Sequence, residues 1–268
     1  MTEELDVELS PELEKFRDKI KSSMKPFISI TSRKEENLAL WQSKFGGFPY
    51  LPKNTEYPKD DQGNPLFLLA QINFSEVPCL EGFPQQGILQ FFIADDELYG
   101  IDFDEPLQQE DFRVIYFSDA QASEEELVTD FSFLPKPEYM PLSSGTTCSL
   151  QFEKKIAPVG ADDYHFDELF GNDFFGQFGK NELAIWKEYT EKFPSSGHKI
   201  GGYAYFTQND PRPPSKNPEE EYVLLLQIDT DNPVDIMWGD SGVGNFFIKK
   251  ADLEKLDFFK VFYNWDCH

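Results

Sequence analysis

The sequence predicts an α+β protein, mainly an antiparallel β roll with peripheral helices, and three observations lead to this prediction. Residues 44–98 and 199–253 carry the same landmarks in the same order, as an internal duplication of a β-rich unit does. The chain holds 27 Phe and is 16% aromatic, which is enough apolar material for a packed core. Its apolar runs have the length of strands and end at turn residues.

Three landmarks define each copy of the predicted unit. A Gly-Gly pair followed by aromatic residues comes first, then a short apolar run with one glutamine, and then a Gly before a strand that ends in Phe-Phe-Ile. These segments are 46–50 and 201–205, 68–72 and 224–228, and 87–93 and 242–248. We therefore predict a single domain over residues 1–268, with pseudo-repeats at about 44–118 and 199–265.

The elements follow in order along the chain. Ser10 and Pro11 mark a helix start, and apolar residues at helical spacing give it one apolar face, which we expect on the outside of the sheet. The apolar residues of that face are Leu9, Leu13, Phe16, Ile20 and Met24. A short second helix is predicted at 37–41. Strands are predicted at 66–74, 99–103, 112–117, 150–156 and 222–229.

Two helices and one loop complete the prediction. The Ser123 to Glu126 pattern of a capping box predicts a short helix after it. Residues 181–193 have helical spacing and stop before a proline, with Leu183, Trp186, Tyr189 and Phe193 on one side. Residues 209–218 are rich in Pro and Asn, which predicts an exposed and mobile loop.

The charge of the chain excludes several classes of partner. A formal net charge of −25 argues against nucleic-acid and anionic membrane surfaces, and it favours steering of a basic protein. No apolar run is long enough for a transmembrane helix, and the start of the chain is acidic where a secretory signal is basic and apolar. Three widely spaced cysteines fit a reducing compartment, so we expect a cytoplasmic protein.

Motifs for catalysis and for metals are missing from the sequence. Residues 239–242 read Gly-Asp-Ser-Gly, like the nucleophile loop of chymotrypsin-type serine proteases, but Val243 replaces the Gly that follows in that loop. The internal alignment also sets this tetrapeptide opposite an ordinary turn at 84–87, so Ser241 is predicted to be a turn residue. We predict no catalytic residue, no metal site and no cofactor.

An acidic-aromatic insertion at residues 162–179 has no counterpart in the other copy. Its carboxylates lack the spacing of a calcium loop. If its five Phe residues face solvent, they form an apolar patch rimmed by carboxylates that suits a basic partner; the alternative is that the rings cover the core. The candidate binding residues of this segment are Phe166, Phe170, Asp162, Asp163 and Asp173.

Gln71 and Gln227 occupy matching positions among apolar neighbours. One interpretation is that each amide satisfies backbone groups within its own copy, because buried amides need hydrogen-bond partners. The other is that both side chains point into one pseudo-twofold cleft and bind a small molecule or a peptide. The sequence leaves both interpretations open.

Taken together, these motifs closely resemble the YwqG-like bacterial family, a domain of unknown function. The segments that carry the resemblance are 46–52 (GGFPYLP), 69–74 (LAQINF), 84–92 (PQQGILQFF) and 238–248 (WGDSGVGNFFI). The resemblance implies a mainly antiparallel roll with peripheral helices and a bacterial source, and it implies no activity, cofactor or site residue. Relatives of this type also occur near bacterial toxin systems, which favours an immunity or partner-binding role.

The function that these observations favour is a non-enzymatic protein-interaction module, one that neutralises or positions a basic partner. The alternative is a small-ligand binder or a cryptic enzyme that uses a cleft between the two repeats. The oligomeric state stays open.

Overall fold

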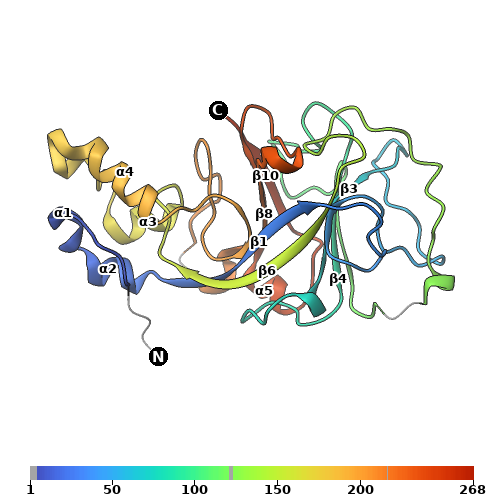
Figure 1. Cartoon of the computed structure of the whole chain (residues 1–268), viewed down its shortest axis with the longest axis horizontal. Coiled ribbons are helices and arrows are strands. Elements are labelled where there is room, and N and C mark those ends of the chain that lie inside the picture. The colour runs from blue at the N-terminus through green and yellow to red at the C-terminus, as the bar shows by residue number, and fades with distance from the viewer. Residues whose placement is uncertain (1–4, 121–122, 216) are drawn as a thin grey trace.

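The computed structural model describes residues 5–120, 123–215 and 217–268 (Figure 1). In this part of the chain ten strands form one sheet, in the order β10-β9-β8-β7-β1-β6-β2-β3-β4-β5, and all neighbours are antiparallel. The strands are β1 (Lys25–Lys34), β2 (Lys44–Gly46), β3 (Phe67–Asn73), β4 (Ile88–Ile93), β5 (Phe112–Phe117), β6 (Thr147–Ala157), β7 (His198–Gly201), β8 (Tyr222–Asp229), β9 (Val243–Lys249) and β10 (Phe262–Asp266). The sheet curls, and the predicted antiparallel α+β roll is confirmed.

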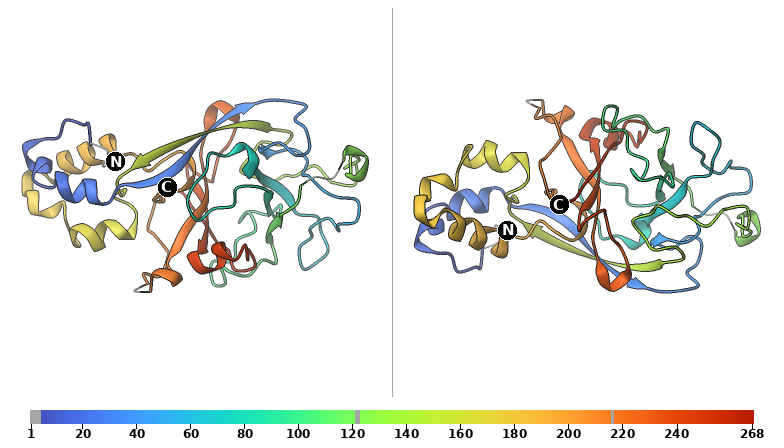
Figure 2. Two further views of the ribbon diagram at one scale, coloured as in Figure 1. Left: turned by 90° about the horizontal axis from the view of Figure 1, so that it is seen from below. Right: turned by 90° about the horizontal axis from the view of Figure 1, so that it is seen from above.

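Helices gather mainly in a lobe at one end of the molecule, which we call the helical lobe (Figures 1 and 2). The lobe contains α1 (Pro11–Glu14), α2 (Arg17–Ser22), α3 (Tyr164–Phe170), the 3-10 helix η3 (Gly176–Asn181) and α4 (Glu182–Lys192). Near the sheet lie α5 (Lys250–Glu254) and the 3-10 helices η1 (Phe74–Glu76), η2 (Glu124–Glu126), η4 (Pro218–Glu220) and η5 (Asn232–Val234). No helix of the described residues is both long and apolar enough to cross a bilayer.

The long central strands β1 and β6 join the two halves of the sheet. They pair over ten residues, from Lys25 opposite Ala157 to Lys34 opposite Cys148. On one side of this pair lie β2 to β5, and on the other side β7 to β10. The strand order is therefore the same in both directions outward from the centre.

The register of the strands also corresponds between the halves. Lys44 on β2 lies opposite Gln71, as Lys199 on β7 lies opposite Gln227. An irregularity falls at the same point of each half, after Leu68 on β3 and after Leu224 on β8. Beyond it, the partners of Gln71 and Gln227 on the next strands are Gln90 and Asn245. This correspondence is what the predicted duplication requires.

The main core lies where the two halves meet. The Phe91 ring of β4 lies 4.8 Å from the Phe246 ring of β9, and Phe246 stacks on Tyr263 of β10 with centroids 4.5 Å apart. All three side chains are fully buried. Because strand side chains alternate between faces, the adjacent Phe92 and Phe247 pack on the other face, in smaller clusters of their own half.

The N-terminal helix does not pack on the sheet as the sequence predicted. Ser10 caps it as expected, because its hydroxyl accepts from the Leu13 amide, but the helix ends and restarts around Phe16. Its buried residues Leu13 and Ile20 form a second core with Tyr189 of α4. Helical spacing identifies an apolar face, but it does not say which surface will cover that face.

Two predicted elements near turns are absent from the structure. Residues 37–41 form no helix: Asn37 adopts a left-handed φ of 64°, and only a turn at residues 40–41 follows. Residues 99–103 form no strand, because Tyr99 and Gly100 both have positive φ and make a turn. The capping box at Ser123 is present, but it starts only the single turn of η2.

The predictions for the other segments are largely confirmed. Strands lie at or near 66–74, 112–117, 150–156 and 222–229, and α4 covers most of 181–193. The loop at 209–218 was predicted to be exposed and mobile, yet Arg212 is buried, because it pairs with Asp210 of the same loop and with Asp163 of the helical lobe. Lys216 lies outside the described residues.

We predict that Phe246→Ala lowers the free energy of unfolding by about 3–5 kcal/mol, because it removes a ring that the two halves share and leaves a cavity. Phe259→Ala is the matched control, since that ring is 87% exposed, and it should change stability by less than about 0.5 kcal/mol. Urea unfolding followed by circular dichroism measures both. Equal effects of the two variants would contradict this account of the core.

Candidate functional sites

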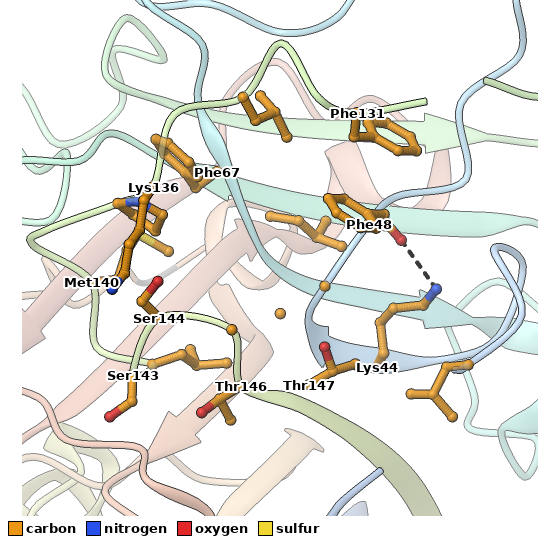
Figure 3. Close-up of a pocket in the computed structure, with 18 of the residues that line it drawn as sticks. Lys44, Phe48, Phe67, Phe131, Lys136, Met140, Ser143, Ser144, Thr146 and Thr147 are labelled. Carbon is orange, nitrogen blue, oxygen red and sulfur yellow. Dashed lines mark hydrogen bonds between the residues drawn. The ribbon is translucent and has the colours of Figure 1, made fainter. Parts of the chain in front are cut away.

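A pocket opens in the N-terminal half of the sheet, and we call it the Phe48 pocket (Figure 3). It has a volume of about 640 Å³ and lies between β2 with its Gly-Gly turn and the connecting segment 131–147. Small-molecule sites commonly have volumes of this order and mostly apolar walls with a few polar groups. The sequence did not predict this pocket, because its walls come from segments far apart in the chain.

One wall of the Phe48 pocket is aromatic and the opposite side carries hydroxyl groups. Phe48 is 52% exposed and stacks face to face on Phe131, with ring centroids 4.7 Å apart. Ser143, Ser144 and Thr147 line the other side, on the segment that leads into β6. Such a site offers apolar surface together with groups that can orient a polar end.

Lys44 is the chemically most distinctive group in this pocket. Its side chain is buried, and burial lowers its pKa to about 8 despite the charge of Glu76. The ammonium donates to three backbone carbonyls, at 2.8 Å to Ala39, 3.3 Å to Leu40 and 3.1 Å to Phe48. An ammonium has three donors, so none is left, and no lone pair is available for attack on a carbonyl. The pocket is therefore suited to binding, and Lys44 holds its walls.

Gln71 is fully buried beside Lys44 and does not line the pocket. Its Oε1 accepts from the Tyr50 amide at 2.7 Å and from the Gln90 amide nitrogen at 2.8 Å. Its Nε2 donates to the carbonyls of Leu40 and Gln42. The amide is saturated by hydrogen bonds within its own half, so it holds the chain around the Gly-Gly turn against the sheet.

Gln227 has the same environment in the other half. Its Oε1 accepts from the Tyr205 amide at 2.8 Å, and its Nε2 donates to the carbonyls of Ser195 and Gly197. Lys199 lies opposite it, is buried, and donates to the carbonyls of Ser195 and Tyr203. Burial lowers the pKa of Lys199 to about 8. The structure thus does not bring the two glutamines together; each serves its own half.

The acidic-aromatic insertion forms α3 and η3 of the helical lobe. Phe166 and Phe174 are buried, and Phe170 packs partly buried against them and against Phe16 from the N-terminal helices. The rings therefore cover one another in a separate core, and they do not cap the core of the sheet. Of the predicted binding residues in this segment, Asp173 is exposed.

Asp163 anchors the lobe to the sheet and is fully buried. It caps α3, and it accepts from the Arg212 guanidinium at 2.8 Å and from the Ala204 amide at 3.0 Å. Although burial disfavours the carboxylate, the charge of Arg212 and the hydrogen bond to His165 hold its pKa well below the usual range. Arg212 in turn lies over the ring of Phe247, 4.5 Å from its centroid.

His165 links this pair to a second carboxylate. Its Nδ1 contacts Asp163, and its Nε2 lies 3.0 Å from Oε1 of Glu221, which also pairs with Lys25. Burial and Lys25 oppose the imidazolium, but the two carboxylates prevail and raise the pKa of His165. The hydrogen bond from His165 lowers the pKa of Glu221 to about 2. This network fixes the position of α3 and leaves no carboxylate of the set free.

A groove on the helical lobe lies between η3 and α4, and we call it the lobe groove. It has a volume of about 620 Å³. Leu183 and Trp186 line it and are 62% and 39% exposed, and three carboxylates, Asp167, Asp173 and Glu182, lie beside them. The sequence placed Leu183, Trp186 and Tyr189 on one side of this helix, but of these three only Tyr189 is buried, together with Ile185. Helical spacing did not show which face of α4 is buried, because both faces carry apolar residues.

Asp162 does not line the lobe groove. Burial raises its pKa to about 6, partly offset by a hydrogen bond from Ser195. It is half-buried, so it offers little to a partner.

Catalytic and metal-binding arrangements are not found among the described residues. Ser241 is exposed in a turn with φ of 59°, and no described histidine hydrogen-bonds to it. In the same ranges, no group of three His, Cys, Asp or Glu side chains is placed to hold a metal ion. Cys79, Cys148 and Cys267 are free thiols.

Residues 43–267 match a family model described as a domain of unknown function, DUF1963. The chain belongs to this family. The matched DUF1963 region runs from the start of β2 to the end of β10 and includes both pockets' main walls, whereas α1, α2 and β1 precede it. No curated protein matches the chain. The DUF1963 description assigns no activity, so the function must be argued from the sites themselves.

We predict that His165→Gln destabilises the protein in a pH-dependent way. Because the folded-state pKa of His165 is raised, its charged form stabilises the fold fully below the unfolded pKa of about 6.5, and this contribution is lost as the pH rises through the folded value. The stability difference between wild type and variant should therefore be largest at mildly acidic pH and shrink at alkaline pH. Urea unfolding at a series of pH values tests this, and a difference that does not vary with pH would contradict it.

We also predict that Ser241→Ala changes stability by about 1 kcal/mol or less, since both residues carry the same strain at positive φ and only an exposed hydroxyl is lost. Labelling of the wild type with a fluorophosphonate probe is the second measurement. Covalent modification at Ser241 would show that it is a nucleophile.

Proposed function

We propose that this chain is a non-enzymatic protein-interaction module that captures a basic partner protein in the lobe groove. The observation that carries this proposal is the exposure of Leu183 and Trp186 side by side on α4, next to the carboxylates of Asp167 on α3, Asp173 between α3 and η3, and Glu182 at the start of α4. Trp is enriched among the residues that anchor protein interfaces, an exposed Leu beside it extends the apolar patch, and surrounding charges select the partner.

The charge of the chain supports a basic partner. The net charge is −25, and within the lobe groove Asp167, Asp173 and Glu182 outnumber Lys180. A partner segment with Lys or Arg beside apolar side chains would be steered by the field of the whole protein. It would then be held by burial of its apolar groups on Trp186 and Leu183.

Saturated polar groups support a binding role over catalysis. Lys44, Lys199 and the Asp163 network have perturbed pKa values, which can indicate a catalytic site. Here the two lysines donate hydrogen bonds to backbone carbonyls and Asp163 forms an ion pair with Arg212, so the shifted pKa values have a structural cause.

The same proposal includes a likeness to the YwqG-like bacterial proteins, a cytoplasmic location and an immunity or positioning role. Each of these fits an acidic protein that binds a partner. The proposed duplication fits the matching strand order.

A second candidate function is small-ligand binding, because the Phe48 pocket has the volume of a ligand site. The sequence had led us to expect a cleft between the two repeats, but this pocket lies within one half.

The test uses an amphipathic helical peptide of Lys and Leu as the probe, with a Glu and Leu peptide of the same pattern for comparison. We expect calorimetric binding of the basic peptide alone. The double variant Leu183→Ala and Trp186→Ala should weaken it by about 2 kcal/mol or more, without loss of stability, because both side chains are exposed.

Two charge variants distinguish binding in the lobe groove from general electrostatic attraction to the acidic chain. Asp167→Asn, Asp173→Asn and Glu182→Gln remove three charges at the groove, and Asp104→Asn, Glu124→Gln and Glu125→Gln remove three exposed charges outside it. The first variant should weaken binding about tenfold. Equal weakening by both variants, or unchanged binding after loss of Trp186 and Leu183, would overturn the proposal.

A further inference from the structure

The Phe48 pocket has a counterpart in the other half of the sheet, and strand register identifies it. Gly46 on β2 lies opposite Thr147 on β6, and Gly201 on β7 lies opposite Phe27 on β1. Thr147 in one half therefore corresponds to Phe27 in the other. Two residues earlier on each central segment, Gly145 corresponds to Lys25.

The counterpart is almost closed. Its volume is about 10 Å³, and Phe27, Lys25 and Tyr203 are among the residues that line it. The side chain of Phe27 packs over Gly202, and the Tyr203 hydroxyl donates to the carbonyl of Ser23 at 2.7 Å. The ammonium of Lys25 lies 4.6 Å from the Tyr203 ring centroid. The chain thus fills this position with its own side chains.

The same position in the N-terminal half lacks these side chains. Thr147 lies over Gly47 where Phe27 lies over Gly202, and Gly145 has no side chain at the place of Lys25. Phe48, the counterpart of Tyr203, is 52% exposed, whereas Tyr203 is only 8% exposed. The Lys and Gln residues beneath are arranged alike in both halves. The frame is shared, and what differs is the group that fills it.

The charge of the Phe48 pocket differs from that of the whole chain. Lys44 and Lys136 line it with Glu36 as the acidic residue, so its net charge is positive in a protein of charge −25. Among the described residues, Lys44 forms no ion pair and contacts only neutral carbonyls. The charge of Glu76 acts on this ammonium, but Glu76 does not line the pocket, so the lysines that do line it give the pocket a positive potential that attracts an anion.

We propose that the Phe48 pocket binds a small amphiphilic carboxylate with an aromatic or compact apolar body. The body takes the space that the Phe27 ring fills in the other half and lies against Phe48. The carboxylate faces Lys136 and the hydroxyl group of Ser144 at the rim. This site is separate from the lobe groove, so it does not depend on the proposed function.

The experiment is calorimetric titration of the full chain with 3-phenylpropionate, 4-phenylbutyrate and octanoate, with 4-phenylbutylamine and 4-phenylbutyramide as the cationic and neutral comparisons. We expect at least one carboxylate to bind, and 4-phenylbutyrate to bind about tenfold more tightly than 4-phenylbutylamine or 4-phenylbutyramide. Binding should also shift amide NMR signals of residues 143–147. Failure of all three carboxylates to bind, or equal binding of the amine, would overturn the proposal.

Thr147→Phe tests the site itself, because it places in the open half the side chain that closes the other half. We expect this variant to fold and to lose carboxylate binding by about tenfold or more. Thr31→Phe is the matched control, since Thr31 is exposed on β1 and lines neither pocket, and it should bind as wild type does. If Thr147→Phe unfolds, Lys136→Met serves instead. Lys136 is exposed, so this substitution should leave the fold intact, and the loss of its charge should weaken binding of the carboxylates but not of the neutral amide. Wild-type binding by either test variant would contradict the assignment.

Discussion

A lysine ammonium buried in each half of the sheet sets the local structure on which the rest depends. A buried charge needs hydrogen-bond partners, and here backbone carbonyls supply three to Lys44 and two to Lys199. Those carbonyls belong to the segments before and after the Gly-Gly turn, so Lys44 and Lys199 each fix the path of a whole loop. The glutamine opposite each lysine binds the same loop from the neighbouring strand. Loop, turn and strand are thus tied together without a metal ion or a disulfide among the described residues.

The two halves share this frame but use the space above it differently. In the C-terminal half β1 and the Tyr203 ring close the space, and the helical lobe packs beyond them, held by Asp163 and Arg212. In the N-terminal half small residues leave the space open, and segment 131–147 forms its outer wall. The corresponding position is thus filled by the chain's own side chains in one half and open in the other, although similar residues surround both.

The helical lobe has both a structural and a surface role. Its aromatic side chains bury one another, and its buried ion network joins it to the sheet. The face of α4 that carries Leu183 and Trp186 has no covering element in the described structure. The lobe is therefore rigidly placed while one apolar face remains available, which is the arrangement that a preorganised interface needs.

The sequence by itself determined the strands with glutamine and Phe-Phe-Ile, because alternation, strand length and turn residues act locally and recur in both copies. It also determined the class of fold and the acidic character of the surface. It missed the role of the N-terminal helix, since an apolar stripe is compatible with any apolar partner. It gave no sign that Lys44 and Lys199 are buried, because lysine is usually exposed and only the carbonyls of distant segments make burial possible. The tertiary structure alone decided that one of two equivalent positions is a pocket and the other is filled, because this depends on which side chains from β1 and β6 meet the Gly-Gly turns across the sheet.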